Sequence, residues 1–235
     1  ASLILADPAR RFRVRAVTRE PDSPAAQQLR QAGAQIAAAD PDDAASVRAA
    51  MRGAGAAFCV THLADHDAPA RETAQARTMA RAAAAADVRH VIWSTLEDTR
   101  DLIPADGRRM PALAGEYNVP HFDAKGAANP HFFDAGVPTT LLYAPFCWDD
   151  PLRFSLAPRR NAAGMLRLLL PIGERRLPGI AAEDIGRCAF GIFARGAELA
   201  GKSIGIAGEH LTGAQMADQL SLALAEPVAH EPLSP

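Results

Sequence analysis

The sequence predicts an α/β protein built on a doubly wound, mostly parallel sheet, with a smaller C-terminal region. Short segments that alternate apolar and polar residues recur along the first part of the chain, and segments with helical features separate them. Helices of this length between strands make right-handed crossovers, which place the strands parallel in one sheet. At 235 residues with 49% hydrophobic residues, the chain can bury the large core that such a sheet needs.

The first expected strand, residues 12–18, ends in a charged turn. The helix that follows, residues 23–33, begins with a serine cap and a proline at its first position, and it ends at a glycine. Pro130 is expected to kink or divide a later helix, because proline has no N–H to donate. The remaining elements in this part are strands at 34–40, 55–61, 88–95 and 137–143 and helices at 42–53, 68–87 and 121–136.

The character of the chain changes after Tyr143. Residues 144–181 contain many prolines and arginines and little periodicity, which predicts loops and short elements over the sheet. A helix at 182–196 with acids in its first turn, a strand at 202–208 and a capped helix at 212–226 follow. We therefore expect a sheet domain at 1–145 and a smaller substrate or partner region at 146–235, partly interleaved with the sheet.

Charge and composition exclude several classes of function. A net charge of -2 and a pI near 6.4 argue against direct binding of nucleic acid or of an anionic membrane surface. No apolar run approaches the roughly 18 residues that span a bilayer. The three cysteines are widely spaced without a CxxC pair, which favours reduced thiols and a cytoplasmic location. His62 and His66 have metal-ligand spacing but lack a third strong ligand in register, so no metal site is expected.

Ligands of doubly wound folds bind beyond the carboxyl ends of the strands, so the residues at those ends are the candidate cofactor contacts. Arg19 fits a 2′-phosphate and favours NADP over NAD, whereas the adjacent Glu20 could instead accept a hydrogen bond from an unphosphorylated ribose. Asp40 either approaches the adenine or forms a turn before Pro41. The residues at the strand ends are Thr18, Arg19, Asp40, Thr61, Ser94 and Pro145.

The glycine-rich turn that holds a pyrophosphate in dinucleotide-binding folds is not in this sequence. The opening residues, ASLILADPARRFRVRAVT, read as the end of a first helix followed directly by the second strand. A doubly wound sheet without its first, central strand leaves two neighbouring strands unpaired. We therefore expect the natural chain to extend N-terminally.

Lys125 is conspicuous because only two of the 25 basic residues are lysine. It lies in the motif VPHFDAKG at 119–126, and this motif, IWSTLED at 92–98 and LPGIAAEDIG at 177–186 resemble those of the NmrA-like family, atypical members of the short-chain dehydrogenase/reductase superfamily. The resemblance covers nearly the whole chain. It implies an NAD(P)-binding domain of the Rossmann type at 1–145, with NADP(H) as the cofactor and a smaller C-terminal region beside it.

The resemblance also gives a role to three residues as catalytic candidates, His121, Lys125 and Ser94. Catalytic members of the superfamily carry a tyrosine four residues before the lysine; the lysine holds the nicotinamide ribose, and the tyrosine is the proton donor. Here His121 occupies the tyrosine position, and Ser94 matches the active-site serine. Each has a purely structural alternative: a solvated helix residue for Lys125, a helix-start hydrogen bond for His121, and a polar strand end for Ser94.

Two functions follow from this substitution. In the first, which we favour, His121 and Lys125 hold the nucleotide without turning it over, and the protein is a redox or nucleotide sensor that acts through a protein partner. In the second, His121 donates or relays a proton near neutral pH, and the protein is an NAD(P)H-dependent oxidoreductase that reduces a quinone, azo compound or enone. The sequence carries no information on the oligomeric state.

Overall fold

The computed structural model describes residues 1–61, 69–103, 117–149 and 157–233. Contacts between residues divide the chain into two compact units. The first consists of residues 1–143 and 186–205, and the second of residues 144–185 and 206–235. Residues 186–205 follow the C-terminal segment 144–185 in sequence but belong with the N-terminal unit.

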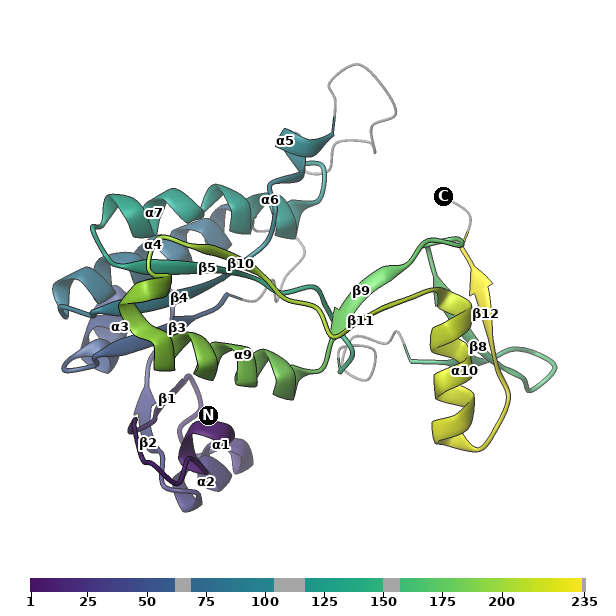
Figure 1. Ribbon diagram of the computed structural model, residues 1–235, viewed down its shortest axis with the longest axis horizontal. Coiled ribbons are helices and arrows are strands. Elements are labelled where there is room, and N and C mark those ends of the chain that lie inside the picture. The colour runs from purple at the N-terminus through teal and green to yellow at the C-terminus, as the bar shows by residue number, and fades with distance from the viewer. Residues whose placement is uncertain (62–68, 104–116, 150–156, 234–235) are drawn as a thin grey trace. The chain divides into compact units, whose positions relative to one another are not determined.

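The first unit is built on a parallel sheet of four strands in the order β10-β5-β4-β3, as Figure 1 shows. Each neighbouring pair in this sheet runs parallel, which confirms the predicted α/β fold. A second parallel sheet pairs β1 with β2. Among the described residues, β1 and β3 are edge strands of these two separate sheets. The six strands are β1 (Arg15–Thr18), β2 (Gln35–Ala38), β3 (Ala56–Cys59), β4 (His90–Thr95), β5 (Thr139–Tyr143) and β10 (Ser203–Gly205).

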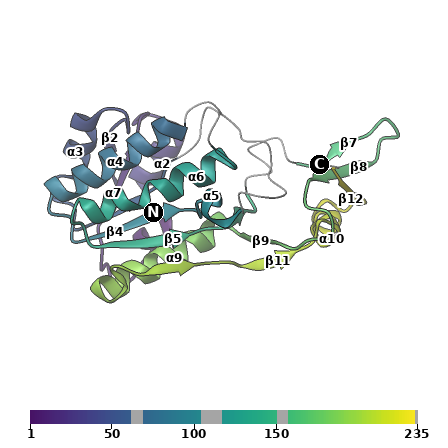
Figure 2. The same cartoon turned by 90° about the horizontal axis from the view of Figure 1, so that it is seen from above.

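Helices cover both faces of the four-stranded sheet. In Figures 1 and 2, α4, α6 and α7 lie on one side of the sheet, and α9 lies on the other. Trp93 of β4 stacks on Phe132 of α7 with ring centroids 4.9 Å apart, and the alanines of α4 let that helix pack closely beside them. The helices that contribute to this unit are α1 (Ser2–Leu5), α2 (Pro24–Gln31), α3 (Ala44–Met51), α4 (Pro69–Ala85), α5 (Thr99–Leu102), α6 (Pro120–Ala127), α7 (Asn129–Asp134), α9 (Ala182–Arg195) and the 3₁₀ helix η1 (Gly196–Leu199).

Local sequence signals explain where these helices begin and end. The Ser23 hydroxyl accepts from the backbone N–H of the third residue of α2, and the Asp43 carboxylate accepts from that of the second residue of α3. The predicted division at Pro130 is confirmed, because the expected helix at 121–136 is split into α6 and α7 at Ala128. The acids predicted in the first turn of α9 are Glu183 and Asp184.

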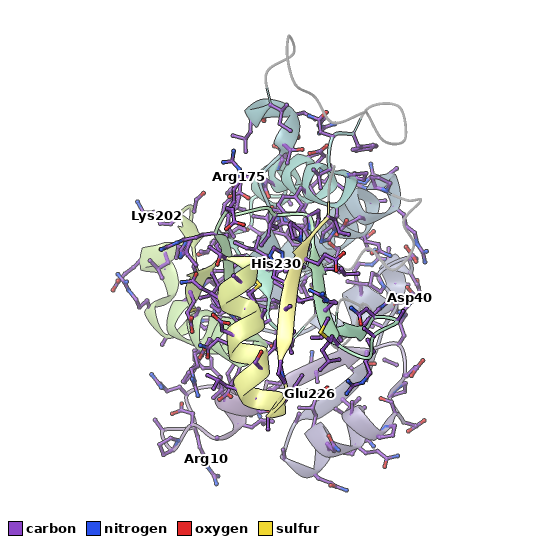
Figure 3. All side chains as sticks on the ribbon, turned by 90° about the vertical axis from the view of Figure 1, so that its right-hand side faces the viewer. Arg10, Asp40, Arg175, Lys202, Glu226 and His230 are labelled. Atoms are coloured by element: carbon purple, nitrogen blue, oxygen red, sulfur yellow. The ribbon has the colours of Figure 1, made fainter. Side chains whose placement is uncertain are left out.

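The second unit contains more regular structure than the sequence predicted for residues 144–181, which we expected to form loops and short elements. Two three-stranded sheets, β11-β9-β6 and β12-β8-β7, form in this unit, and α10 packs on β12 and β8. Glu226, which follows α10 and is labelled in Figure 3, accepts from Arg160 of β7 at 2.6 Å. The elements of this unit are β6 (Phe146–Cys147), β7 (Arg159–Arg160), β8 (Leu166–Leu170), β9 (Leu177–Ile180), β11 (Glu209–Leu211), α10 (Gly213–Leu224) and β12 (Val228–Pro232).

Candidate functional site

Four of the residues predicted from the sequence lie together in the first unit, around a carboxylate that was not predicted. Glu72, in the first turn of α4, is 2% exposed and forms the centre of this cluster. Its Oε1 accepts from the hydroxyl of Thr61 at 2.6 Å, and its Oε2 lies 2.9 Å from Nδ1 of His121. Lys125 Nζ lies 4.0 Å from Oε1 and donates to the backbone oxygen of Ser94 at 2.9 Å.

The ammonium group of Lys125 is held inside the protein. The residue is 4% exposed, and its Nζ lies 5.1 Å from the centre of the Trp93 ring in addition to its contacts with Ser94 and Glu72. Burial lowers the pKa of Lys125 to about 8, and the negative charge of Glu72 offsets part of that effect. Lys125 is therefore a desolvated cation with donor capacity beyond its one hydrogen bond.

Glu72 stays ionised despite its burial. Desolvation raises the pKa of a carboxyl group, but the hydrogen bonds from His121 and Thr61, together with the charges of His121 and Lys125, outweigh it and lower the pKa of Glu72. At neutral pH, Glu72 is therefore a buried, negatively charged carboxylate that lies beside two basic side chains.

His121 and Lys125 reach Glu72 from the same side of α6 because four residues separate them, about one helical turn. The side chain of His121 keeps 34% of its surface exposed, while the carboxylate that it contacts is buried. An ionised carboxylate can only accept hydrogen bonds, so Nδ1 of His121 carries the proton and donates a hydrogen bond to Oε2. The cluster can thus offer a polar ligand the ammonium of Lys125 and the partly exposed ring of His121.

Strand β4 holds α6 in position at the break between α6 and α7. The Thr95 hydroxyl donates to the side-chain oxygen of Asn129 at 2.6 Å and lies 3.1 Å from the backbone oxygen of Lys125. The indole N–H of Trp93 donates to the same Asn129 oxygen at 3.0 Å. Thr73 of α4 also donates to a backbone oxygen of α6. The bonds from Thr95 and Trp93 hold α6 and the start of α7 against β4, the strand that contains Ser94.

Ser94 contributes its backbone oxygen to the cluster, which differs from the side-chain role expected from the sequence. Its position at the end of β4 places that oxygen against the lysine.

The other predicted cofactor contacts do not join this cluster. Thr18 accepts a hydrogen bond from the backbone N–H of Glu20 at the end of β1, and Arg19 is exposed. Asp40 accepts from the backbone N–H of Asp42, which is the turn role that was one of its two alternatives. Pro145 lies between β5 and β6, in the second unit.

The described part of the chain shows neither a metal-binding cluster nor a membrane-spanning helix. Among the residues that the structure describes, no group of three His, Cys, Asp or Glu side chains is arranged to hold a metal ion. His62 and His66 lie outside those residues. None of the described helices has the length and apolar character needed to cross a membrane.

Comparison with known proteins identifies relatives. The model of the NmrA-like family matches residues 1–234. NmrA, a negative transcriptional regulator, has been solved in complex with NAD, and it is 23% identical with a TM-score of 0.79; the match covers 99% of this chain and 70% of that one. The same regulator has been solved with NADP, with 24% identity, a TM-score of 0.74 and the same coverage.

Two enzymes share the fold to a similar degree. Triphenylmethane reductase from Citrobacter sp., solved with NADP(H), is 17% identical with a TM-score of 0.72, and the match covers 99% of this chain and 73% of that one. An NADPH-dependent quinone oxidoreductase from Escherichia coli, solved with NADPH, is 22% identical with a TM-score of 0.73 and the same coverage. Similarity at these identities establishes the fold, and the neighbours include both a regulator and reductases.

Proposed function

This chain belongs to the NmrA-like family, and we propose that it is a cytoplasmic NADP(H)-binding sensor that acts through a protein partner. The dinucleotide part of the proposal is supported by the neighbours, which were solved with NAD, NADP or NADPH. The regulatory part draws on the neighbour described as a negative transcriptional regulator.

The residues present suit the polar, hydroxyl-rich part of a nicotinamide dinucleotide. Lys125 supplies a buried ammonium group that still has N–H donors free after its bond to Ser94. Thr61 and His121 are both hydrogen-bonded to the carboxylate of Glu72, beside this ammonium group. At the end of β1, the exposed guanidinium of Arg19 would favour the 2′-phosphate of NADP. Thr18, Asp40 and Pro145 complete the proposed set of cofactor contacts, and the chemistry that the nucleotide supplies when bound is hydride transfer.

The observation that carries the sensor proposal is the pairing of His121 with Glu72. The tyrosine that donates a proton in catalytic relatives is replaced by His121, and Nδ1 of that histidine is already bound to a buried carboxylate. Lys125, which would hold the nucleotide, is retained and buried. The group that would hold the nucleotide is therefore present, while the usual proton donor is absent.

The same pairing favours a second candidate, an NAD(P)H-dependent oxidoreductase. A histidine that a carboxylate orients is a common proton relay, and the side chain of His121 is partly exposed. Quinones, azo compounds and enones accept hydride with less help from an acid, so they are the substrate classes that this arrangement would reduce. The quinone oxidoreductase among the neighbours agrees with that class.

One experiment separates the two candidates. Calorimetric titration of the protein with NADPH, NADP⁺, NADH and NAD⁺ measures affinity, and stopped-flow absorbance then follows NADPH oxidation with a panel of quinones and azo dyes. Tight binding of NADP(H) without oxidation supports the sensor. Turnover that falls in His121→Asn supports the oxidoreductase, and absence of binding by all four nucleotides contradicts both.

A further inference from the structure

We propose that Glu72 is a positioning residue that fixes His121 with its proton on Nδ1, so that Nε2 is presented as a hydrogen-bond acceptor to a hydroxyl group of a ligand. The tautomer follows from the geometry of the protein alone. The hydroxyl step rests on the proposed function, because it requires a bound nucleotide.

The two oxygens of Glu72 have separate partners. Oε1 accepts from Thr61 and faces the ammonium of Lys125, whereas Oε2 is left for His121. The carboxylate cannot rotate to exchange these oxygens without breaking the 2.6 Å bond from Thr61. This division holds the imidazole ring in one orientation, because Oε2 is the acceptor within reach of Nδ1.

Glu72 also occupies a position where packing alone calls for an apolar side chain. Ala76, Met79, Ala80 and Ala83 lie along the same buried stripe of α4. Burying a carboxylate there is unfavourable until its hydrogen-bond and charge partners offset the loss of solvent. A charge in such a place, shared between a lysine and a histidine, indicates a function beyond packing.

The state of Nε2 follows from the proton on Nδ1. A neutral imidazole carries one proton, and the bond to Glu72 places it on Nδ1, which leaves a lone pair on Nε2. Neutral His121 therefore accepts a hydrogen bond at Nε2 and cannot donate one there. It becomes a donor at Nε2 only as the imidazolium. A hydroxyl-bearing ligand, such as a ribose, matches the neutral state.

The tautomer is measured by ¹⁵N–¹H correlation spectra of ¹⁵N-histidine-labelled protein, with the His121 signals assigned from the spectrum of His121→Asn. The spectra are recorded at a pH at which the ¹⁵N shifts themselves show a neutral ring. We expect a protonated Nδ1 and an unprotonated Nε2 in the wild-type protein. In Glu72→Gln, the amide can donate as well as accept, so we expect the signals of the other tautomer to appear.

Thr61→Val is the matched control, because it removes a partner of Oε1 and keeps the carboxylate. We expect its His121 signals to keep the wild-type tautomer. A wild-type ring protonated on Nε2, or identical His121 signals in Glu72→Gln and wild type, overturns the positioning role. A folded Glu72→Gln variant is verified by circular dichroism, and Glu72→Asp is the second variant if Glu72→Gln does not fold.

The hydroxyl step is tested on the same sample by adding NADP⁺. Acceptance of a hydrogen bond moves the Nε2 shift of His121, and we expect this movement in the wild-type protein. An unmoved Nε2 shift overturns the hydroxyl step in every case. Parallel calorimetry then separates two causes. If NADP⁺ binds, it binds without contacting His121, and if it does not bind, the proposed function fails as well. The tautomer result does not depend on either outcome.

Discussion

Gly126 of α6 lies directly against the backbone of Asp98, so closely that a β-carbon on Gly126 would stand 2.6 Å from the Asp98 nitrogen. The contact joins Gly126, the residue after Lys125, to Asp98, which lies just beyond the end of β4. Ser94 is the second-last residue of that strand. A glycine is needed here for close approach and not for an unusual backbone angle.

Gly126→Ala is expected to destabilise the protein. The added methyl group meets backbone atoms of Asp98, which cannot rotate away as a side chain would, so we expect the free energy of unfolding to fall by about 1–3 kcal/mol. Urea unfolding followed by circular dichroism measures the change.

Gly191→Ala in α9 is the matched control for this substitution. A β-carbon on Gly191 would meet no atom within 4 Å, and alanine is favoured over glycine inside a helix by about 0.5–1 kcal/mol. We therefore expect this variant to be as stable as the wild type or more so. Equal losses of stability in both variants would contradict the close approach at Asp98.

Thr95→Val tests the bonds that hold α6 to β4. Valine has the shape of threonine, but it removes the hydroxyl that donates to Asn129 and leaves that partly buried oxygen with one donor fewer. We expect the free energy of unfolding to fall by about 1–3 kcal/mol. Thr78→Val is the control, because within the described residues the Thr78 hydroxyl bonds to its own helix alone. Its loss should change stability by less than about 0.5 kcal/mol.

The fold was largely predictable because its helices and central strands carry local signals. The alternation in 88–95 and 137–143 predicted β4 and β5, and Pro130 predicted the break between α6 and α7. The strands of the second unit were not predicted. β8 pairs with β12, and β9 pairs with β11, which come much later in the chain, so no pattern inside 144–181 shows these partners.

The site was predictable only in part. The spacing of His121 and Lys125 placed both on one side of a helix, which the structure shows. Glu72 was missed because an acid near the start of an alanine-rich helix resembles a solvated residue that complements the helix dipole. The available signal was its spacing from Ala76, Met79 and Ala83, which places it on the buried stripe.

Cys59 is expected to be unreactive in the folded protein. It is buried in the core, and burial raises the pKa of its thiol to about 12, so almost no thiolate forms at pH 8. An Ellman assay at that pH should detect Cys59 only after unfolding in guanidinium. Cys59→Ala identifies its contribution: it should lower the number of thiols titrated in the unfolded protein and leave the native number unchanged. A lower native number would contradict the prediction.

Arg19→Ala and Lys125→Ala should change nucleotide affinity in different ways. Loss of the Arg19 guanidinium removes the proposed partner of the 2′-phosphate, so NADPH affinity should fall roughly 10-fold or more while NADH affinity stays nearly constant. Loss of the Lys125 ammonium should weaken both nucleotides. Calorimetry measures all four affinities, and Arg13→Ala, an exposed arginine before β1, is the control. Equal losses for both nucleotides in Arg19→Ala would contradict the 2′-phosphate assignment.

Lys125 should lose its proton at an unusually low pH, and the chain allows a direct measurement. Lys125 and Lys202 are the only lysines in the sequence, so protein labelled with ¹³C at lysine Cε gives two signals to follow with pH. Lys202 lies on the surface and is labelled in Figure 3, and Lys202→Arg assigns the spectrum. We expect the Lys125 signal to titrate with a pKa of about 8.

The same shift predicts how stability depends on pH. Between pH 8 and the ordinary lysine value of 10.5, the unfolded chain binds a proton at Lys125 that the folded protein has released. The free energy of unfolding contributed by this group therefore rises with pH across that window, by up to about 3 kcal/mol, because each pKa unit corresponds to about 1.4 kcal/mol. Urea unfolding of wild type and Lys125→Met at several pH values isolates the effect, since other groups titrate in both. A difference between the two proteins that stays constant from pH 8 to 10.5 would show that burial does not depress the pKa of this lysine.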